Sequence, residues 1–171
     1  QTFQTPEAIA VYSDAGLGGM SAQFHTLCAK HIVRGKFADQ PRPILLNNWE
    51  ATYFNFDHDK LVKLAKTAAR VGVELFVLDD GWFGHRDSDN SSLGDWVVDR
   101  RKLPGGLTPL AEEIHQMGLK FGLWFEPEMI SPDSDLYRAH PEWAVQTSVR
   151  TPTLCRTQYV LDMTREDVRE Y

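Results

Sequence analysis

The chain has 171 residues and a net charge of −6, with 42% hydrophobic and 25% charged residues. This length is enough to bury the core of one domain. The acidic balance and the lack of a basic run exclude nucleic acid as an expected partner. No apolar stretch is long enough to cross a bilayer, so we expect no membrane association either.

The cysteines and the first residue bear on where the protein works. Cys28 and Cys155 lie far apart and form no Cys-x-x-Cys pair of the kind found at zinc or redox sites. We therefore expect two free thiols in a reducing compartment, the cytoplasm. Residue 1 is Gln rather than Met, and no signal-type segment follows it. We expect the sequence to lie within a longer polypeptide.

Residues 1–42 differ from the rest of the chain. We predict a short strand over residues 5–13, a glycine-rich loop over residues 16–20 and a helix over residues 21–33. A polar stretch over residues 35–43, which ends Gln-Pro-Arg-Pro, is typical of a linker. The whole segment is predicted to be a connector from a preceding domain.

From Pro43 onward, predicted strands and helices alternate. The first strand covers residues 44–49. A helix capped by Asp57 then runs to Val71, with one buried face formed by Leu61, Leu64, Ala65, Ala68 and Val71. Residues 73–78 form an apolar run predicted to be a strand buried on both faces, and it ends in Asp79-Asp80-Gly81-Trp82.

A long polar loop over residues 83–107 precedes the second half of the pattern. Thr108-Pro109 is predicted to open a helix, with Thr as its N-cap, that Gly118 ends. A strand over residues 119–125, a short helix over residues 131–140 and a fourth strand over residues 159–162 follow. A final helix is predicted to begin near Thr164, in a pattern like a capping box.

Four successive strand–helix units predict parallel strands with right-handed crossovers. A doubly wound sheet and half of a barrel both fit this order. Three observations favour the barrel: polar or aromatic residues follow every strand, no glycine-rich phosphate loop follows the first strand, and the longest loop follows a strand. We predict an α/β fold, the first half of a (β/α)8 TIM barrel over residues 43–171, since a complete barrel takes roughly 250 residues.

The residues at the strand ends predict a carbohydrate pocket. Asp79 and Asp80 can each accept hydrogen bonds from sugar hydroxyls, and Trp49 and Trp124 can pack on the apolar face of a pyranose ring. The competing interpretation is an Asp N-cap followed by a turn glycine, with both tryptophans in the core.

Five motifs together resemble the α-galactosidases of glycoside hydrolase family 36. The resemblance covers residues 43–171 as an ordered series, and residues 1–40 resemble more weakly the junction between that family's N-terminal β-sandwich and its barrel. The motifs are Asn48-Trp49-Glu50-Ala51, Leu78-Asp79-Asp80-Gly81-Trp82-Phe83-Gly84, Gly94-Asp95-Trp96, Gly122-Leu123-Trp124-Phe125-Glu126-Pro127-Glu128, and Cys155-Arg156 followed by Val160-Leu161-Asp162.

The resemblance implies a retaining hydrolase of terminal α-galactosides that needs no cofactor and no metal. In that family the nucleophile is the aspartate of a Lys-Trp-Asp type motif on the next barrel strand, and the acid/base aspartate lies further on. No such motif occurs here, so no catalytic residue is expected in this chain. By the same resemblance Asp79 and Asp80 hold the O4 and O6 side of galactose, Trp49 and Trp124 line the pocket, and Arg156 is a polar sugar contact or an ordinary ion-pair residue.

Several alternatives stay open. Asp79 and Asp80 are unsuited to be a catalytic pair, because adjacent strand residues point to opposite sides. Glu126 and Glu128 flank Pro127 and are expected to be structural. A metal site built from Asp79, Asp80 and the His-x-Asp-x-Asp stretch at residues 85–89 lacks the rest of an EF-hand loop.

The alternatives for function are a related transglycosylase of the raffinose synthase type, an α-N-acetylgalactosaminidase, or a fragment that binds sugar without catalysis. The expected partner is a galactoside substrate, and the whole protein is expected to be a homo-oligomer.

Overall fold

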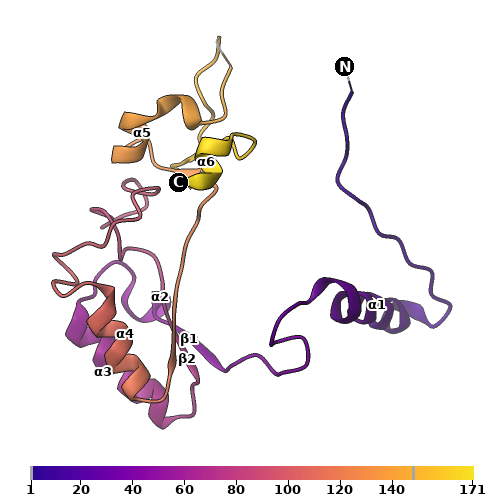
Figure 1. Ribbon diagram of the computed structural model, residues 1–171, viewed down its shortest axis with the longest axis horizontal. Helices are drawn as coiled ribbons and strands as arrows, with labels where there is room; N and C mark the ends of the chain where they lie inside the picture. Colours follow the sequence, from indigo (N-terminus) through magenta and orange to yellow (C-terminus); the bar gives the residue numbers. More distant parts are fainter. Residues whose placement is uncertain (1, 148) are drawn as a thin grey trace. The chain divides into compact units, whose positions relative to one another are not determined.

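The computed structural model describes residues 2–147 and 149–171, and the chain divides into two compact units (Figure 1). One unit ends at Arg42 and the other runs from Pro43 to Tyr171. Within the described ranges, no helix has the length and apolar character that crossing a membrane requires.

The first unit contains the helix α1 (Gly16–Leu27), which continues into a π-helical turn, η1 (Cys28–Ile32). The predicted strand over residues 5–13 is wrong, because no described segment pairs with it. The predicted glycine loop is wrong too, since the helix already begins at Gly16. The Ser13 hydroxyl accepts from the Ala15 N–H at 3.2 Å and donates to the Gly16 carbonyl at 3.1 Å. A Cβ at Gly19 would lie 2.6 Å from that hydroxyl, so this glycine makes room for the Ser13 side chain.

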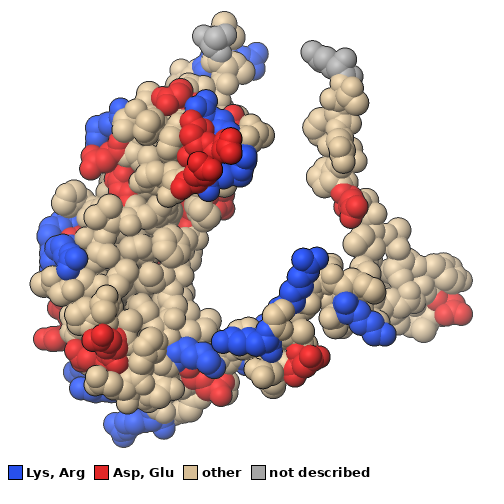
Figure 2. All heavy atoms as spheres, in the orientation of Figure 1, with Lys and Arg blue, Asp and Glu red and all other residues tan. Residues whose placement is uncertain are grey.

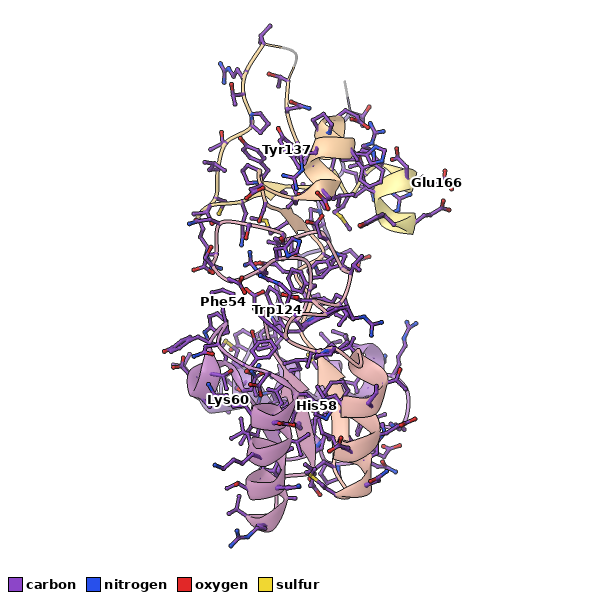
Figure 3. The ribbon with its side chains drawn as sticks, turned by 90° about the vertical axis from the view of Figure 1, so that its left-hand side faces the viewer. Phe54, His58, Lys60, Trp124, Tyr137 and Glu166 are labelled. Carbon is purple, nitrogen blue, oxygen red and sulfur yellow. The ribbon has the colours of Figure 1, made fainter. Side chains whose placement is uncertain are left out.

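The second unit is built on a three-stranded parallel sheet in the order β1 (Leu45–Asn47), β2 (Leu75–Leu78) and β3 (Lys120–Leu123). The helices α3 (His58–Arg70) and α4 (Leu107–Gln116) connect successive strands and lie side by side (Figure 3). Their apolar faces form one core with β2, whose fully buried members include Leu61, Ala65, Phe76, Leu78, Leu110 and Ile114.

Local sequence signals set the bounds of these helices. The Asp57 carboxylate accepts from the Lys60 N–H at 2.8 Å and caps α3 as predicted. Val71 is 76% exposed, because the helix has already ended at Arg70 and the chain turns away from the core. The predicted Thr108 cap of α4 is wrong: Gly106, at φ +85°, is the N-cap and Thr108 lies inside the first turn.

The prediction that the first strand is buried is wrong for β1. Leu45 is 52% exposed, because β1 is hydrogen-bonded to β2 alone and is an edge of the described sheet. The strand also ends earlier than predicted, and Trp49 begins a single helical turn, α2 (Trp49–Thr52). Phe76 and Leu78 of β2 are buried, whereas Leu75 and Val77 are half-buried.

The predicted fourth parallel strand is also wrong. Residues 159–160 form β5 (Tyr159–Val160), which pairs antiparallel with β4 (Met129–Ile130), a strand that the sequence pattern did not reveal. The chain turns sharply after β3, where the Met129 N–H donates to the Glu126 carbonyl at 3.3 Å. This turn carries β4 out of the parallel sheet.

A second apolar cluster lies against this small sheet. It draws on α5 (Asp135–Ala139), the 3-10 turn η2 (Pro141–Trp143) and α6 (Glu166–Glu170), and its buried members are Ile130, Leu136, Trp143, Leu161 and Val168.

Acidic and basic side chains are interspersed over the face of the second unit, residues 43–171, that is seen in Figure 2.

Candidate functional site

The candidate site lies at the edge where the three parallel strands end. The hydrogen-bond ladder continues past β1 and β3 on both sides of β2: the Asn48 N–H donates to the Val77 carbonyl at 3.2 Å, and the Trp124 N–H donates to the Leu78 carbonyl at 2.9 Å. Asn48, Asp79 and Trp124 therefore follow neighbouring strands at one edge, which is where parallel α/β folds bind ligands.

Two asparagines from the end of β1 fix Asp79. The buried Asn48 accepts from the Asp79 N–H at 2.7 Å and donates to the Thr52 hydroxyl at 2.7 Å. The Asn47 amide donates to the Asp79 carboxylate, and its carbonyl oxygen accepts from the Trp49 N–H at 2.7 Å. Asp79 is half-buried, and these contacts tie it to the backbone of Trp49.

Asp80 has a different environment. It is buried, and its Oδ1 accepts from Nε of Arg86 at 2.6 Å. Burial raises the pKa of the Asp80 carboxyl above its usual range, although the hydrogen bond and the charge of Arg86 act in the opposite direction. The structure therefore gives the two adjacent carboxylates different surroundings, one held by amides and one held by a buried guanidinium.

The turn after Asp80 is tightly packed. Gly81 has φ +96°, and a Cβ there would lie 2.9 Å from the Phe54 ring. The Lys102 ammonium donates to the carbonyls of Gly81 at 2.9 Å and Arg86 at 2.8 Å, and it pairs with Asp87 at 3.0 Å. Lys102 thus ties the far end of the long loop to the turn that carries the carboxylates.

The two predicted tryptophans are half-buried and sit in aromatic surroundings. Trp49 makes edge contacts with Tyr53 and Phe54, with ring centroids 5.2 and 4.9 Å apart. The Trp124 ring lies 6.5 Å from Phe83 in a stacked arrangement. Figure 3 shows Phe54 and Trp124 beyond the end of α3 that carries His58 and Lys60. Each indole therefore packs against the core on one side and is partly exposed on another. This agrees with core packing and leaves surface that a sugar ring could contact.

Arg156 reaches the site through charge rather than through a direct contact with the aspartates. Its Nη2 lies 3.8 Å from Oδ1 of Asp89, and Nη2 of Arg86 lies 3.9 Å from the same oxygen. The Arg156 side chain is 66% exposed, so the ion-pair interpretation fits this geometry. Burial raises the pKa of Glu126, while the positive charges of Arg156 and Arg86 oppose that shift.

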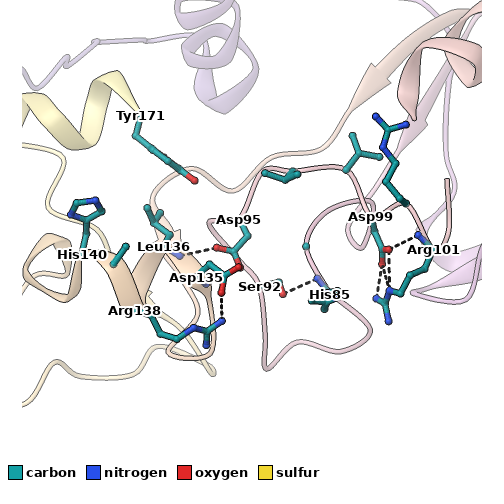
Figure 4. Close-up of a pocket in the computed structure, with 15 residues that line it drawn as sticks. His85, Ser92, Asp95, Asp99, Arg101, Asp135, Leu136, Arg138, His140 and Tyr171 are labelled. Carbon is teal, nitrogen blue, oxygen red and sulfur yellow. Dashed lines mark hydrogen bonds and ion pairs between the residues drawn. The ribbon is translucent and has the colours of Figure 1, made fainter. Parts of the chain in front are cut away.

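Asp95 is a structural residue. Its two carboxylate oxygens accept from the N–H groups of Asp135 at 3.0 Å and Leu136 at 2.9 Å, at the start of α5 (Figure 4). Burial raises the pKa of this carboxyl. Asp95 lies on a cavity of about 610 Å³ between the long loop and α5. Its oxygens are occupied by backbone donors at the start of α5.

The structure brings Asp79, Asp80 and Trp124 to one edge of the sheet and ties Trp49 to Asp79 through Asn47. Arg156 pairs with Asp89 and has no direct contact with the two aspartates within the described residues. The sequence interpretation quoted Asn48 in a motif but assigned no role at the site to Asn47, Asn48, Arg86 or Lys102. The signal for Arg86 in the sequence is its position six residues after Asp80, a predicted sugar-binding carboxylate. Within residues 2–147 and 149–171, no group of three or more His, Cys, Asp or Glu side chains is arranged to hold a metal ion.

The sequence model of the family described as Melibiase matches residues 2–171. The chain is 57% identical over 171 residues to Alpha-galactosidase AgaA of Geobacillus stearothermophilus, covering 100% of this chain and 24% of that protein. It is 56% identical over 170 residues to Alpha-galactosidase Mel36A of Lactobacillus acidophilus, covering 99% and 23%.

Among solved structures, a variant of AgaA in complex with raffinose matches with a TM-score of 0.90 and 57% identity, over 94% of this chain and 22% of that one. The chain thus spans about a quarter of the length of the curated relatives it matches.

Proposed function

The chain belongs to the Melibiase family, and on that premise we propose that the whole protein is an α-galactosidase of glycoside hydrolase family 36. It removes terminal α-D-galactose from galactosides such as melibiose and raffinose and retains the anomeric configuration. The observation that carries this proposal is the pair of carboxylates, Asp79 and Asp80, at the carboxyl edge of a parallel sheet, where Trp124 follows the neighbouring strand.

We propose that residues 43–171 are the N-terminal half of a (β/α)8 catalytic barrel and that residues 1–42 connect it to a preceding β-sandwich. The three parallel strands with α3 and α4 between them support the barrel. The small sheet of β4 and β5 would then be an insertion after the third barrel strand rather than part of the barrel wall.

In this proposal the chain supplies residues that bind the sugar. A carboxylate accepts from two neighbouring hydroxyls, and a charged acceptor makes hydrogen bonds about twice as strong as a neutral one. Asp79 and Asp80 would receive the O4 and O6 hydroxyls, while Trp49 and Trp124 would line the ring faces. Arg156 would contact the sugar through a rotation away from Asp89, which its exposure allows.

The chemistry would come from carboxylates outside this chain. A retaining hydrolase needs two carboxyl groups roughly 5–5.5 Å apart on opposite sides of the glycosidic bond. Asp79 and Asp80 are consecutive and held in separate networks, and Asp95 caps a helix. We therefore assign neither the nucleophile nor the acid/base carboxylate to a described residue of this chain.

The whole protein, assayed with an aryl α-galactoside and with raffinose, is expected to release galactose. The 171-residue chain assayed alone is expected to release none. An aryl α-N-acetylgalactosaminide cleaved in preference, or a raffinose-type product built from a galactosyl donor, would favour the two related enzymes. A whole protein that binds galactose without any turnover would favour the non-catalytic alternative.

Two further predictions accompany the proposal. A cytoplasmic location is supported by the two cysteines, which are free and exposed. Assembly of the whole protein as a homo-oligomer stays a prediction from the family resemblance.

A further inference from the structure

Arg86 is a buried arginine in a polar loop. Its side chain is 1% exposed, and its partner Asp80 is buried beside it. Removing two charges from water is costly, and replacing a buried ion pair by apolar residues often leaves stability unchanged or improved. The pair is therefore poorly explained by stability alone, and its geometry suggests a different purpose.

The guanidinium is held rigidly from several sides. Nε donates to Oδ1 of Asp80 at 2.6 Å and Nη1 donates to the Ser91 carbonyl at 2.7 Å. The Phe54 and Phe83 rings each lie 5.8 Å from the guanidinium carbon, at a distance where the ring faces attract a cation. Arg86 is therefore anchored by Ser91 and the two rings independently of Asp80, and its hydrogen bond restricts where Oδ1 of Asp80 can lie.

We propose that Arg86 is the positioning residue of the sugar site: it binds one oxygen of Asp80, Oδ1, and presents the other, Oδ2, to a galactose hydroxyl. This inference rests on the proposed function and adds a residue to it. Within the described part of the chain, Arg86 is the one side chain that donates a hydrogen bond to Asp80. Arg86 thus occupies Oδ1, the Gly81 backbone also acts on this carboxylate through a hydrogen bond, and in the proposal Oδ2 faces the ligand.

The charges around Asp80 make Arg86 necessary for a second reason. Burial is the main effect that raises the pKa of Asp80 and disfavours its ionised form, and the like charge of Asp79 adds to it. Asp80 and Glu126 also repel each other. Arg86 is the opposing cation in contact. Lys102 bonds to the backbone of the same turn and Arg156 faces Glu126, so both act from further away. Without Arg86 the Asp80 pKa would rise, and the carboxylate would be protonated at a higher pH.

The test uses the whole protein and an aryl α-galactoside, with kcat and KM measured as a function of pH. For Arg86→Met we expect KM to rise roughly tenfold or more and the acid limb of kcat/KM to move up by about one pH unit or more. In an Asp80→Asn background the same change should alter KM by less than about twofold, because the residue through which Arg86 acts is already altered.

Two further variants keep the inference testable if Arg86→Met does not fold. Arg86→Lys retains the charge, so the acid limb should stay in place. A lysine lacks the planar fork through which Nε and Nη1 reach Asp80 and Ser91 in a fixed geometry, so KM should rise several-fold. Arg101→Met is the matched control: Arg101 lies on the same loop and pairs with Asp99 and Asp87. This control should leave the acid limb and KM unchanged.

The outcomes separate the inference from the proposed function. A wild-type protein that turns over no α-galactoside refutes both. An active wild type refutes this inference alone if Arg86→Met lowers thermal stability without moving KM or the acid limb. Two other results would refute this inference alone. One is an effect of Arg86→Met on KM that is as large in the Asp80→Asn background as in the wild type, and the other is a wild-type KM for Arg86→Lys.

Discussion

Asp80→Asn in the whole protein is the sharpest single perturbation, because it keeps the shape of the side chain and removes its charge. Two effects follow from the structure. The sugar loses one charge-assisted hydrogen bond, worth about 1.5–3 kcal/mol, which lowers kcat/KM roughly 10- to 150-fold. Arg86 loses its buried anionic partner and keeps the exposed Asp89, 3.9 Å away; the loss of a buried partner typically costs about 3–5 kcal/mol of stability.

The assay for Asp80→Asn is steady-state kinetics on an aryl α-galactoside, paired with thermal unfolding to correct for the folded fraction. Asp87→Asn is the control: Asp87 is exposed and pairs with Lys102 and Arg101 at 3.0 Å, and such surface pairs contribute only about 0–1 kcal/mol. The control should keep wild-type kcat/KM. A lower Tm for Asp80→Asn with unchanged kcat/KM would refute the reasoning, since Asp80 would then be structural only.

Three further predictions follow from the same contacts. Azide should restore no activity to Asp79→Ala or Asp80→Ala, because neither carboxylate forms the covalent intermediate; a galactosyl azide product would contradict this. Asp95→Ala should increase hydrogen exchange in α5 about tenfold or more, from the loss of two backbone hydrogen bonds, while KM stays unchanged; a protected α5 would refute the capping role. Burial acts to raise the pKa of Asp99, but hydrogen bonds and charge from Arg101 outweigh it and hold the pKa below 3.8. Because the folded pKa is lowered, the stabilisation is present above pH 3.8 and lost as the pH falls through the folded value. Amide hydrogen exchange in the long loop should therefore be slower in the wild type than in Asp99→Asn above pH 3.8, and the difference should disappear once the pH falls below the folded pKa of Asp99. A difference that persists at that low pH would show that the pKa of Asp99 is not coupled to stability in this direction.

The sequence was most informative where local and long-range signals agree. The apolar run at β2 ends in two carboxylates, and both its strand conformation and its position at the carboxyl edge were predictable from that pattern. The helix α3 was predictable because Asp57 caps it and apolar residues recur on one face. In each case, residues close in sequence determine the structure.

The misses have one common physical cause, which is that the deciding contact is distant in sequence or too short to form a pattern. β4 has two residues, so no periodicity could reveal it, and without β4 the antiparallel pairing of β5 could not be foreseen. Gly19 lies inside the helix against the Ser13 side chain, six residues earlier in the chain.

The same limit applies to the site. Asp79 and Asp80 were predictable as neighbours of a strand end, but their separate environments were not. Asn48 reaches Asp79 from 31 positions away, and Arg86 reaches Asp80 across a loop whose conformation depends on Lys102. Contacts of this kind follow from the folded arrangement and leave little trace in residue spacing.

A crystal structure of the whole protein with galactose bound tests the central claim most directly. The account predicts galactose hydroxyls within about 2.6–3.2 Å of Asp79 and Asp80, with Oδ1 of Asp80 still bound to Arg86 and an indole of Trp49 or Trp124 against the sugar. Galactose bound elsewhere, with neither aspartate touching a hydroxyl, would contradict it.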